Sequence, residues 1–339
     1  MHKNFIKHLL IILIIFSNSS FGKEFEELFT IYVPIENSSK IESSINKSFN
    51  NLVFRISGSK SPSNIWKIIN SGSTRKDFIQ SYSIKNINSS SYLEVNFDQE
   101  LIINKFKDLS IPIIGYSRPV IFFLINVESG SNAPYYISED SESEIDNIIK
   151  ETLVEISNER GLFLELPVLD LADKQFLSNT NILSSPKTYL ISKYNFDELI
   201  EIKYTNLGLN KWLISGDIDT EIKSNAYSDE IKKIFIDHVE SRIESIYQNL
   251  IIDTAKTKLL KLKIQGINSF EEYELLKEKL SKFISVSKIK ILNFNNKSIT
   301  YEISVMGDIS TFKNTIENST FFEVVHDSNE NFLHVRFIK

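Results

Sequence analysis

The chain contains no cysteine, and glycine (10) and proline (7) are scarce among its 339 residues. The missing cysteine excludes disulfides, thiolate catalysis and cysteine-based zinc sites. It also removes the residue to which bacteria attach a lipid anchor, so a lipoprotein is excluded. The fold must therefore rest on packing, for which a hydrophobic content of 42% and an aromatic content of 12% supply enough apolar material for two or three domains.

Basic residues are also fewer than acidic ones, with 38 Lys and Arg against 44 Asp and Glu. The formal net charge is −6, and it becomes −8 without residues 1–22, which hold Lys3 and Lys7 and no acid. An acidic chain of this size lacks the basic face that nucleic acid requires. No stretch alternates basic residues with aromatic ones, as a single-strand binder would. We therefore expect no nucleic-acid partner.

Hydrophobic runs long enough to cross a membrane are missing too. The run Leu9–Phe16 is far shorter than the roughly 20 residues that a spanning helix needs. It follows a basic start and precedes Ser20 and Gly22, which are small residues suited to cleavage before Lys23. This pattern is typical of a secretory signal peptide. We predict a periplasmic mature chain with no membrane span once residues 1–22 are removed, and a retained anchor is the alternative.

Alternating helical and strand periodicity through the rest of the chain predicts an α+β fold of tandem small α/β sandwich-type domains. The predicted units are a signal peptide (1–22), an N-terminal α+β domain (23–110), a central α/β domain (111–227), a long closing helix (228–258) and a ferredoxin-like C-terminal domain (259–339).

Local patterns predict the elements of the first two domains. Strands are expected at Leu28–Ile35, Phe78–Ile84, Tyr92–Phe97, Val120–Val127, Leu162–Leu166, Glu198–Tyr204, Trp212–Ser215 and Ile218–Ile222. Helices are expected after Ser38 or Ser39, Pro62, Asp98 and Glu144, and at Asp170 and Pro186.

Three segments have more specific predictions. Val120–Val127 is apolar apart from Asn126, which suits a strand buried on both faces. Ser129–Glu144 is polar and contains a glycine and a proline, so we expect an exposed loop. An apolar stripe predicts a long helix from Asp229 to about Thr257, with Ser228 as its N-terminal cap.

The C-terminal segment has the clearest pattern. Ser269 and Glu272 form a capping box at the start of its first helix. Its elements are expected at Leu259–Ile264, Ser269–Phe283, Val286–Phe294, Ser298–Val305, Ile309–Ile316, Phe321–His326 and Phe332–Phe337. The order strand–helix–strand–strand–helix–strand is the ferredoxin-like plan, here with one extra strand.

Four motifs between Phe29 and about Thr220 carry a family resemblance. They are Phe29 to Ser57 with the close Arg55-Ile56-Ser57-Gly58, Gly115-Tyr116-Ser117-Arg118-Pro119, the segment from Arg160-Gly161 to Asp170-Leu171, and Tyr194 to Ile200 followed by Lys211-Trp212. Together they resemble a bacterial envelope family catalogued as domain of unknown function 2066. Phe163 stands where that family has proline, and Asn195-Phe196 where it has Gly-Ala. The resemblance implies an exported protein. It supplies no catalytic residues, because the family has no assigned activity.

The sequence contains no recognisable metal-binding, phosphate-binding or catalytic-serine motif. His238, His326 and His334 lack the close helical spacing of a zinc motif. His326 and His334 could meet across adjacent strands, although two solvated strand positions are the simpler interpretation. The chain has no G-x-S-x-G elbow, Walker loop or dinucleotide-binding loop. We therefore assign no cofactor and no metal.

The best acidic cluster for acid–base chemistry is Glu165, Asp170 and Asp173. Asp170 and Asp173 are more simply first-turn helix acids, which the helix dipole favours. Arg118 could pair with one of these acids, bridge loop carbonyls or lie on the surface. We favour structural roles and assign no catalytic residue.

These observations favour a non-enzymatic envelope interaction or scaffold module. Such a module would present sheet edges and the segment Ser129–Glu144 to a protein partner. The alternatives are a periplasmic hydrolase that uses Glu165 and Asp170, and a glycan-binding protein that uses Trp66 or Trp212. The sequence identifies neither the partner nor the oligomeric state.

Overall fold

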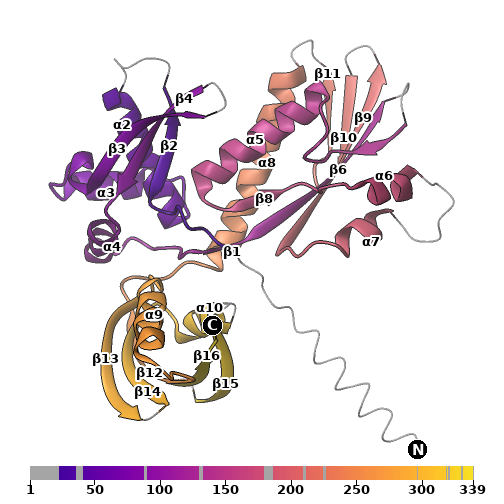
Figure 1. The fold of residues 1–339 in the computed structure, drawn as a ribbon. Coiled ribbons are helices and arrows are strands. Elements are labelled where there is room, and N and C mark those ends of the chain that lie inside the picture. The colour runs from indigo at the N-terminus through magenta and orange to yellow at the C-terminus, as the bar shows by residue number, and fades with distance from the viewer. Residues whose placement is uncertain are drawn as a thin grey trace, which may run out of the picture.

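The structure is a computed structural model. It describes residues 23–35, 41–87, 90–129, 133–178, 186–208, 211–223, 227–295, 297–317, 319, 321–329 and 331–338. The leader and the Ser38 or Ser39 cap lie outside these ranges. Within them, helices and several sheets confirm the α+β class (Figure 1). No helix in the described ranges is both long and apolar enough to cross a membrane.

The N-terminal domain is a three-stranded antiparallel sheet with helices packed on one face. Its sheet has the order β2-β4-β3, so β2 and β3 are the edge strands. The strands are β2 (Thr30–Pro34), β3 (Ile79–Ile87) and β4 (Ser90–Phe97), and the helices are α2 (Ile41–Ser57), α3 (Ser63–Asn70), the short η2 (Arg75–Phe78) and α4 (Gln99–Asp108). Asp98 caps α4 as predicted, because its Oδ1 accepts a hydrogen bond from the Leu101 amide at 2.9 Å.

The central domain is a mixed sheet with the order β11-β10-β9-β6-β7, and β8 also pairs with β6. Its strands are β6 (Val120–Ser129), β7 (Tyr135–Tyr136), β8 (Phe163–Glu165), β9 (Glu198–Gly208), β10 (Lys211–Gly216) and β11 (Thr220–Lys223). Its helices are α5 (Glu144–Arg160), α6 (Leu171–Ser178), α7 (Pro186–Ile191) and α8 (Tyr227–Gln248).

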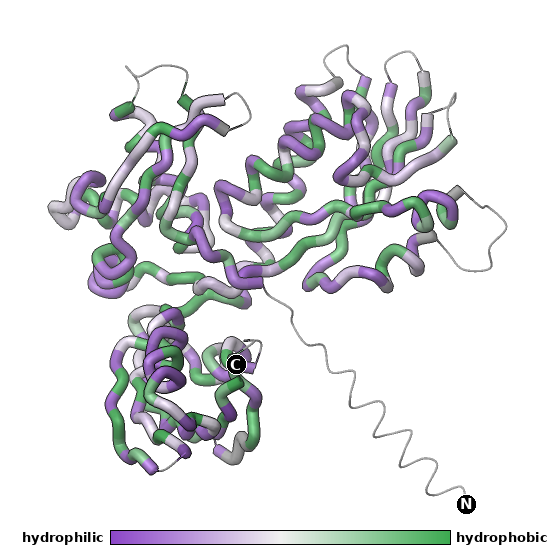
Figure 2. The backbone as a smooth tube through the Cα atoms, viewed as in Figure 1, coloured by the Kyte–Doolittle hydropathy of each residue, from purple (hydrophilic) through white to green (hydrophobic). Residues whose placement is uncertain are grey.

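Strand β6 is the centre of this domain, and its first six residues, 120–125, are all hydrophobic (Figure 2). Its side chains on one face, such as Phe123, pack against α5 and α8. Its side chains on the other face, Phe122 and Leu124, pack beside α6, α7 and the segment that follows them. The prediction of a strand buried on both faces is therefore confirmed.

Two predictions for this domain are wrong in detail. Ser129–Glu144 is not simply an exposed loop, because β7 lies within it, pairs with β6 and leads into the buried residues Ile137 and Ser138. Helix α8 ends at Gln248 rather than near Thr257, and Ser228 lies inside it rather than at its cap. The chain beyond α8 is drawn into a backbone bridge between Ile252 and Ile113, which ends the helix early.

The C-terminal domain is a five-stranded sheet with the order β13-β14-β12-β16-β15. Its elements are β12 (Thr257–Gln265), α9 (Phe270–Ser281), β13 (Val286–Asn295), β14 (Ser298–Met306), α10 (Ile309–Glu317), β15 (Phe322–Asn329) and β16 (Phe332–Phe337). The strand and helix order agrees with the prediction, but β12 and β16 are parallel neighbours, whereas the first and last strands of a ferredoxin-like sheet run antiparallel, so the ferredoxin-like topology is met only in part. The extra strand accounts for this difference, because β16 lies between β12 and β15 and the strand that follows α10, β15, is displaced to the edge.

Each of the three domains has its own large hydrophobic cluster. The clusters lie between Leu28 and Ile113, between Ile114 and Tyr247, and between Leu260 and Phe337. Helix α8 contributes to the central cluster. Ile284 is an exception, because it belongs to the C-terminal segment yet packs in the N-terminal cluster. The predicted domain boundaries remain a prediction, which isolated fragments can test.

Candidate functional site

The acidic residues singled out in the sequence are held by structural contacts. Glu165 forms an ion pair with Lys23, which lies in the short strand β1 (Lys23–Glu24). Asp170 Oδ1 accepts a hydrogen bond from the Asp173 amide at 2.8 Å, and Asp173 Oδ2 accepts one from the Asp170 amide at 3.0 Å. These reciprocal bonds close the N-terminus of α6. No hydrogen bond joins Glu165 to either aspartate in the described structure.

Asp173 is the most enclosed of these acids. Its side chain is fully buried, and its Oδ1 accepts a hydrogen bond from the Tyr189 hydroxyl at 2.7 Å and pairs with Lys193. Burial would raise the pKa of this carboxyl, but the hydrogen bonds from Lys193 and Tyr189 outweigh burial and lower the pKa below its ordinary value. Asp173 is therefore held as a carboxylate that joins α6 to α7 and the turn after it.

Arg118 is fully buried, and it forms no ion pair with a carboxylate in the part of the chain that the structure describes. Its Nε donates to the Gly115 carbonyl at 2.7 Å, and its Nη2 donates to the Ile114 carbonyl at 3.1 Å. Its Nη1 donates to the Arg55 carbonyl at 3.0 Å and to the Tyr247 hydroxyl at 3.1 Å. Of the roles considered from the sequence, bridging loop carbonyls is the one that the geometry matches.

Arg118 belongs to a buried group that we call the arginine cluster: Arg55, Arg118, Arg160 and Tyr247. Tyr247 lies beneath two of the guanidinium groups, at 5.5 Å from Arg118 and 5.4 Å from Arg160. Burial and the neighbouring Arg118 lower the pKa of Arg55. The cluster sits where α2, α5 and α8 meet, between the N-terminal and central domains.

Two glycines make room for the arginine cluster. Gly161 has φ +64°, and a Cβ there would lie 2.7 Å from Cγ of Arg55. Gly58 has φ +72°, and a Cβ there would collide with the side chain of Ile114. Both positions therefore require glycine for backbone shape and for space. The motifs Arg55–Gly58, Gly115–Pro119 and Arg160-Gly161 thus meet at one place, where they join two domains.

The remaining sequence candidates do not converge on a ligand site. Backbone pairing sets His326 opposite His334, as predicted, and Nε2 of His334 lies 3.2 Å from Oε1 of Gln265. The side chain of His326 lies outside the described structure. Within that structure, no three His, Cys, Asp or Glu side chains are placed to hold a metal. Trp66 is 58% exposed on α3, whereas Trp212 is partly packed against the central core.

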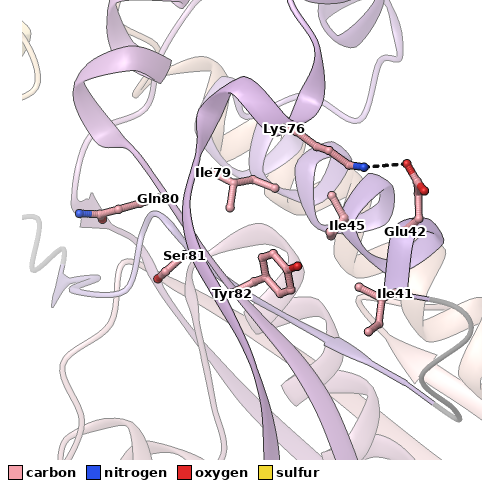
Figure 3. A pocket seen from close by; sticks show the side chains of 8 residues that line it. All are labelled: Ile41, Glu42, Ile45, Lys76, Ile79, Gln80, Ser81 and Tyr82. Carbon is pink, nitrogen blue, oxygen red and sulfur yellow. Dashed lines mark hydrogen bonds and ion pairs between the residues drawn. The ribbon is translucent and has the colours of Figure 1, made fainter.

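The strongest candidate for binding is a groove between helix α2 and strand β3, which we call the β3 groove (Figure 3). Its floor is apolar. Tyr82 and Ile79 point from β3 toward Ile45 and Ile41 of α2. Tyr82 stands opposite the buried Val95 on β4, so it lies on the helix-covered face of the sheet. It is nevertheless 55% exposed, because α2 does not cover this edge of the sheet.

The rim and the outer face of the same edge are polar. Lys76 Nζ and Glu42 Oε1 form an ion pair at 2.9 Å at one end of the β3 groove (Figure 3). On the outer face, Glu94 accepts a hydrogen bond from Ser83 at 3.1 Å and pairs with Lys85 at 3.3 Å. Strand β3 thus has an apolar inner face, a polar outer face and a free edge. This combination suits an added strand.

The sequence predicts a strand at β3 but contains no sign of the β3 groove. Alternation in the segment Phe78–Ile84 indicates which side chains face inward. It does not indicate that β3 is an edge strand, since that depends on the order β2-β4-β3. An inward-facing tyrosine on a strand of unknown position is most simply a core residue.

Comparison of the chain with known protein-family models, with curated proteins and with solved structures finds no match. The resemblance to domain of unknown function 2066 therefore stays a prediction.

Proposed function

We propose that this chain is an exported bacterial envelope protein that acts as a non-enzymatic interaction module, and that it binds an extended segment of a protein partner along β3. The observation that carries the proposal is the β3 groove, where a free strand edge lies beside an apolar channel. Export rests on the leader pattern of residues 1–22. N-terminal sequencing of the cellular protein should begin at Lys23, and an intact leader would contradict export with cleavage.

The proposed binding mode is addition of a strand to the sheet. A partner segment would continue the sheet beyond β3 through main-chain hydrogen bonds, which give affinity without much dependence on sequence. Alternate side chains of that segment would enter the β3 groove and cover Tyr82 and Ile84, which are 55% and 51% exposed. Burying such apolar surface is worth about 25 cal/mol per Å² before the costs of association.

The hydrolase alternative has weaker support. Its acids, Glu165 and Asp170, have separate structural partners, namely Lys23 and the first turn of α6. Neither faces the β3 groove. The glycan-binding alternative retains one suitable residue, the exposed Trp66, but it has no second aromatic residue beside it in the described ring contacts.

Site-specific photocrosslinking in living cells tests the proposal. A benzoylphenylalanine at position 82 should give a discrete crosslinked product, because Tyr82 lies in the β3 groove. Mass spectrometry should place the crosslink in an extended segment of the partner. The matched control is position 101, because Leu101 is 49% exposed on α4 of the same domain but lies outside the groove.

A second pair of variants separates binding from folding. Ile84→Glu, combined with the probe at position 82, should reduce the crosslinked product at least about tenfold, since a charge would lie against the partner's apolar side chains. Leu101→Glu should leave the product unchanged, and both variants should melt like the wild type. Absence of any product at position 82, or a product that Ile84→Glu does not reduce, would contradict the proposal.

A further inference from the structure

A second free edge lies in the C-terminal domain. Strand β13 is at the end of the sheet order, and its residues from Lys288 to Asn295 are all exposed. Strand β13 is therefore an end strand of its sheet, as β3 is in the N-terminal domain, and no further strand pairs with its outer edge among the described residues. The side chains of β13 restrict the kind of segment that can bind there more than the side chains of β3 do.

On the face of the sheet that packs against α9 and α10, β13 carries large apolar side chains that remain exposed. Ile289, Ile291 and Phe294 stand opposite Ile303, Tyr301 and Ile299 of β14, all of which are buried. Their own exposures are 41%, 48% and 63%. A groove between β13 and the start of α9 is lined by Ile291, Phe294, Tyr273 and Phe270, and Phe270 is 72% exposed.

The opposite face of β13 is basic. Lys288 and Lys290 stand across from Ser304 and Glu302 of β14, and Lys261 of β12 flanks Glu302 on its other side. None of these three lysines forms an ion pair within the described residues. The lysines outnumber Glu302, so positive charge remains unmatched beside the free edge.

We propose that β13 binds an extended segment of a protein partner in which apolar and acidic residues alternate. Such a segment, paired with β13, would place its apolar side chains beside Phe270 and Phe294 and its carboxylates beside Lys288 and Lys290. This site lies in a different domain from the β3 groove, and the two have in common only that each binds a protein partner.

The same charges argue against other occupants. A second copy that paired through its own β13 in antiparallel fashion would bring the Lys288 and Lys290 side chains of both copies onto one face, where like charges repel. A phosphate-bearing ligand would engage the lysines but would leave the apolar groove on the other face uncovered. An added strand is the ligand that contacts both faces at once.

The test uses the purified mature chain and two fluorescent synthetic peptides measured by anisotropy. One peptide alternates glutamate with valine and isoleucine, and the other has lysine in place of every glutamate. The acidic peptide should bind at least tenfold more tightly than the basic one. The double variant Lys288→Glu/Lys290→Glu should reverse this preference. The control Lys211→Glu/Lys233→Glu changes two exposed lysines of the central domain that form no ion pair within the described ranges, and it should leave the preference unchanged.

The apolar face is tested by Phe294→Ser. This variant should weaken binding of the acidic peptide at least fivefold without changing the melting temperature, because Phe294 is 63% exposed. Equal binding of both peptides, or a preference that survives the Lys288 and Lys290 reversal, would overturn the inference. So would a dimer in sedimentation velocity that Phe294→Ser dissociates, since a second copy would then occupy the edge.

The two proposals can fail separately. Normal peptide binding at β13 together with no crosslink at position 82 would contradict the proposed function and leave this inference standing. A specific crosslink at position 82 without selective peptide binding would do the reverse.

Discussion

The hydroxyl of Tyr247 accepts a hydrogen bond from Nη1 of Arg118 at 3.1 Å and donates one to the main-chain oxygen of Arg160 at 2.9 Å. Tyr247 is 1% exposed and Arg118 is fully buried. One phenol thus connects α8 to the end of α5 and to the strand entry at Arg118. Because Arg118 also binds the carbonyl of Arg55 in α2, this pair fixes the N-terminal domain against the central one.

Removing that hydroxyl should lower stability while the packing remains. We expect Tyr247→Phe to reduce the free energy of unfolding by about 1–3 kcal/mol, because buried polar partners lose a hydrogen bond that no water replaces. Urea unfolding followed by tryptophan fluorescence measures the change. Tyr82→Phe is the matched control, since Tyr82 is 55% exposed and should change stability by less than about 0.5 kcal/mol. Equal effects of the two variants would contradict the role assigned to Tyr247.

The arginine cluster shows which parts of a buried polar group can be predicted from sequence and which cannot. Local motifs brought attention to Arg55, Arg118 and Arg160, but no spacing rule brings three segments from different domains together. For Arg118 the sequence allowed a carboxylate, loop carbonyls or the surface as its surroundings. Tyr247 carries no signal in the sequence beyond its place in a predicted helix, because its two hydrogen bonds depend on tertiary packing.

Elements with strong local signals were predicted well. Ser143, Asp98 and Ser269 cap helices at or beside the predicted starts, and their side chains accept amide hydrogen bonds. Predictions missed where a distant segment decides the outcome. The bridge between Ile252 and Ile113 ends α8 early, and pairing with β6 turns part of a polar segment into β7. Edge positions such as β3 and β13 depend on strand order, which local periodicity does not contain.

The buried carboxylate of Asp173 should make stability depend on pH. Its folded-state pKa lies below the ordinary value of 3.8, so its contribution is fully present above that value and is lost as pH falls through the lower folded-state pKa. We expect Asp173→Asn to lower the melting temperature at pH 7 and to differ less from wild type as the pH approaches 3.

Melting curves between pH 3 and pH 7 measure this dependence. Asp140→Asn is the control, because Asp140 pairs with Lys174 at the exposed surface at 3.7 Å and such pairs contribute little. A difference between wild type and Asp173→Asn that stays constant over this range would contradict the assigned role.

Substitution of Ile284 tests whether the C-terminal domain folds by itself and how it is attached to the N-terminal domain. Fragment 259–339 has its own core, so it should unfold cooperatively on heating. Ile284 is 6% exposed in the whole chain, where it packs in the N-terminal cluster. Ile284→Ala should therefore cost about 2–5 kcal/mol in the whole chain and much less in the fragment.

Ile303→Ala provides the comparison, because Ile303 is fully buried within the C-terminal core. It should destabilise the fragment and the whole chain to similar degrees. Circular dichroism with thermal and urea unfolding measures all four proteins. A fragment without a cooperative transition would show that the domain needs its neighbours to fold.

Glu165 and Asp170 decide between the interaction module and the hydrolase. If both acids are structural, Asp170→Asn should lower the free energy of unfolding by about 1 kcal/mol through a weakened helix cap, and cellular function should persist. Glu165→Gln should lose only the partly exposed pair with Lys23, with little effect on melting. If the acids were catalytic, both variants would melt normally and abolish function, as loss of an acid–base pair requires. Thermal melting combined with complementation of a deletion strain separates these outcomes, and normal melting with complete loss of function in both variants would overturn the non-enzymatic proposal.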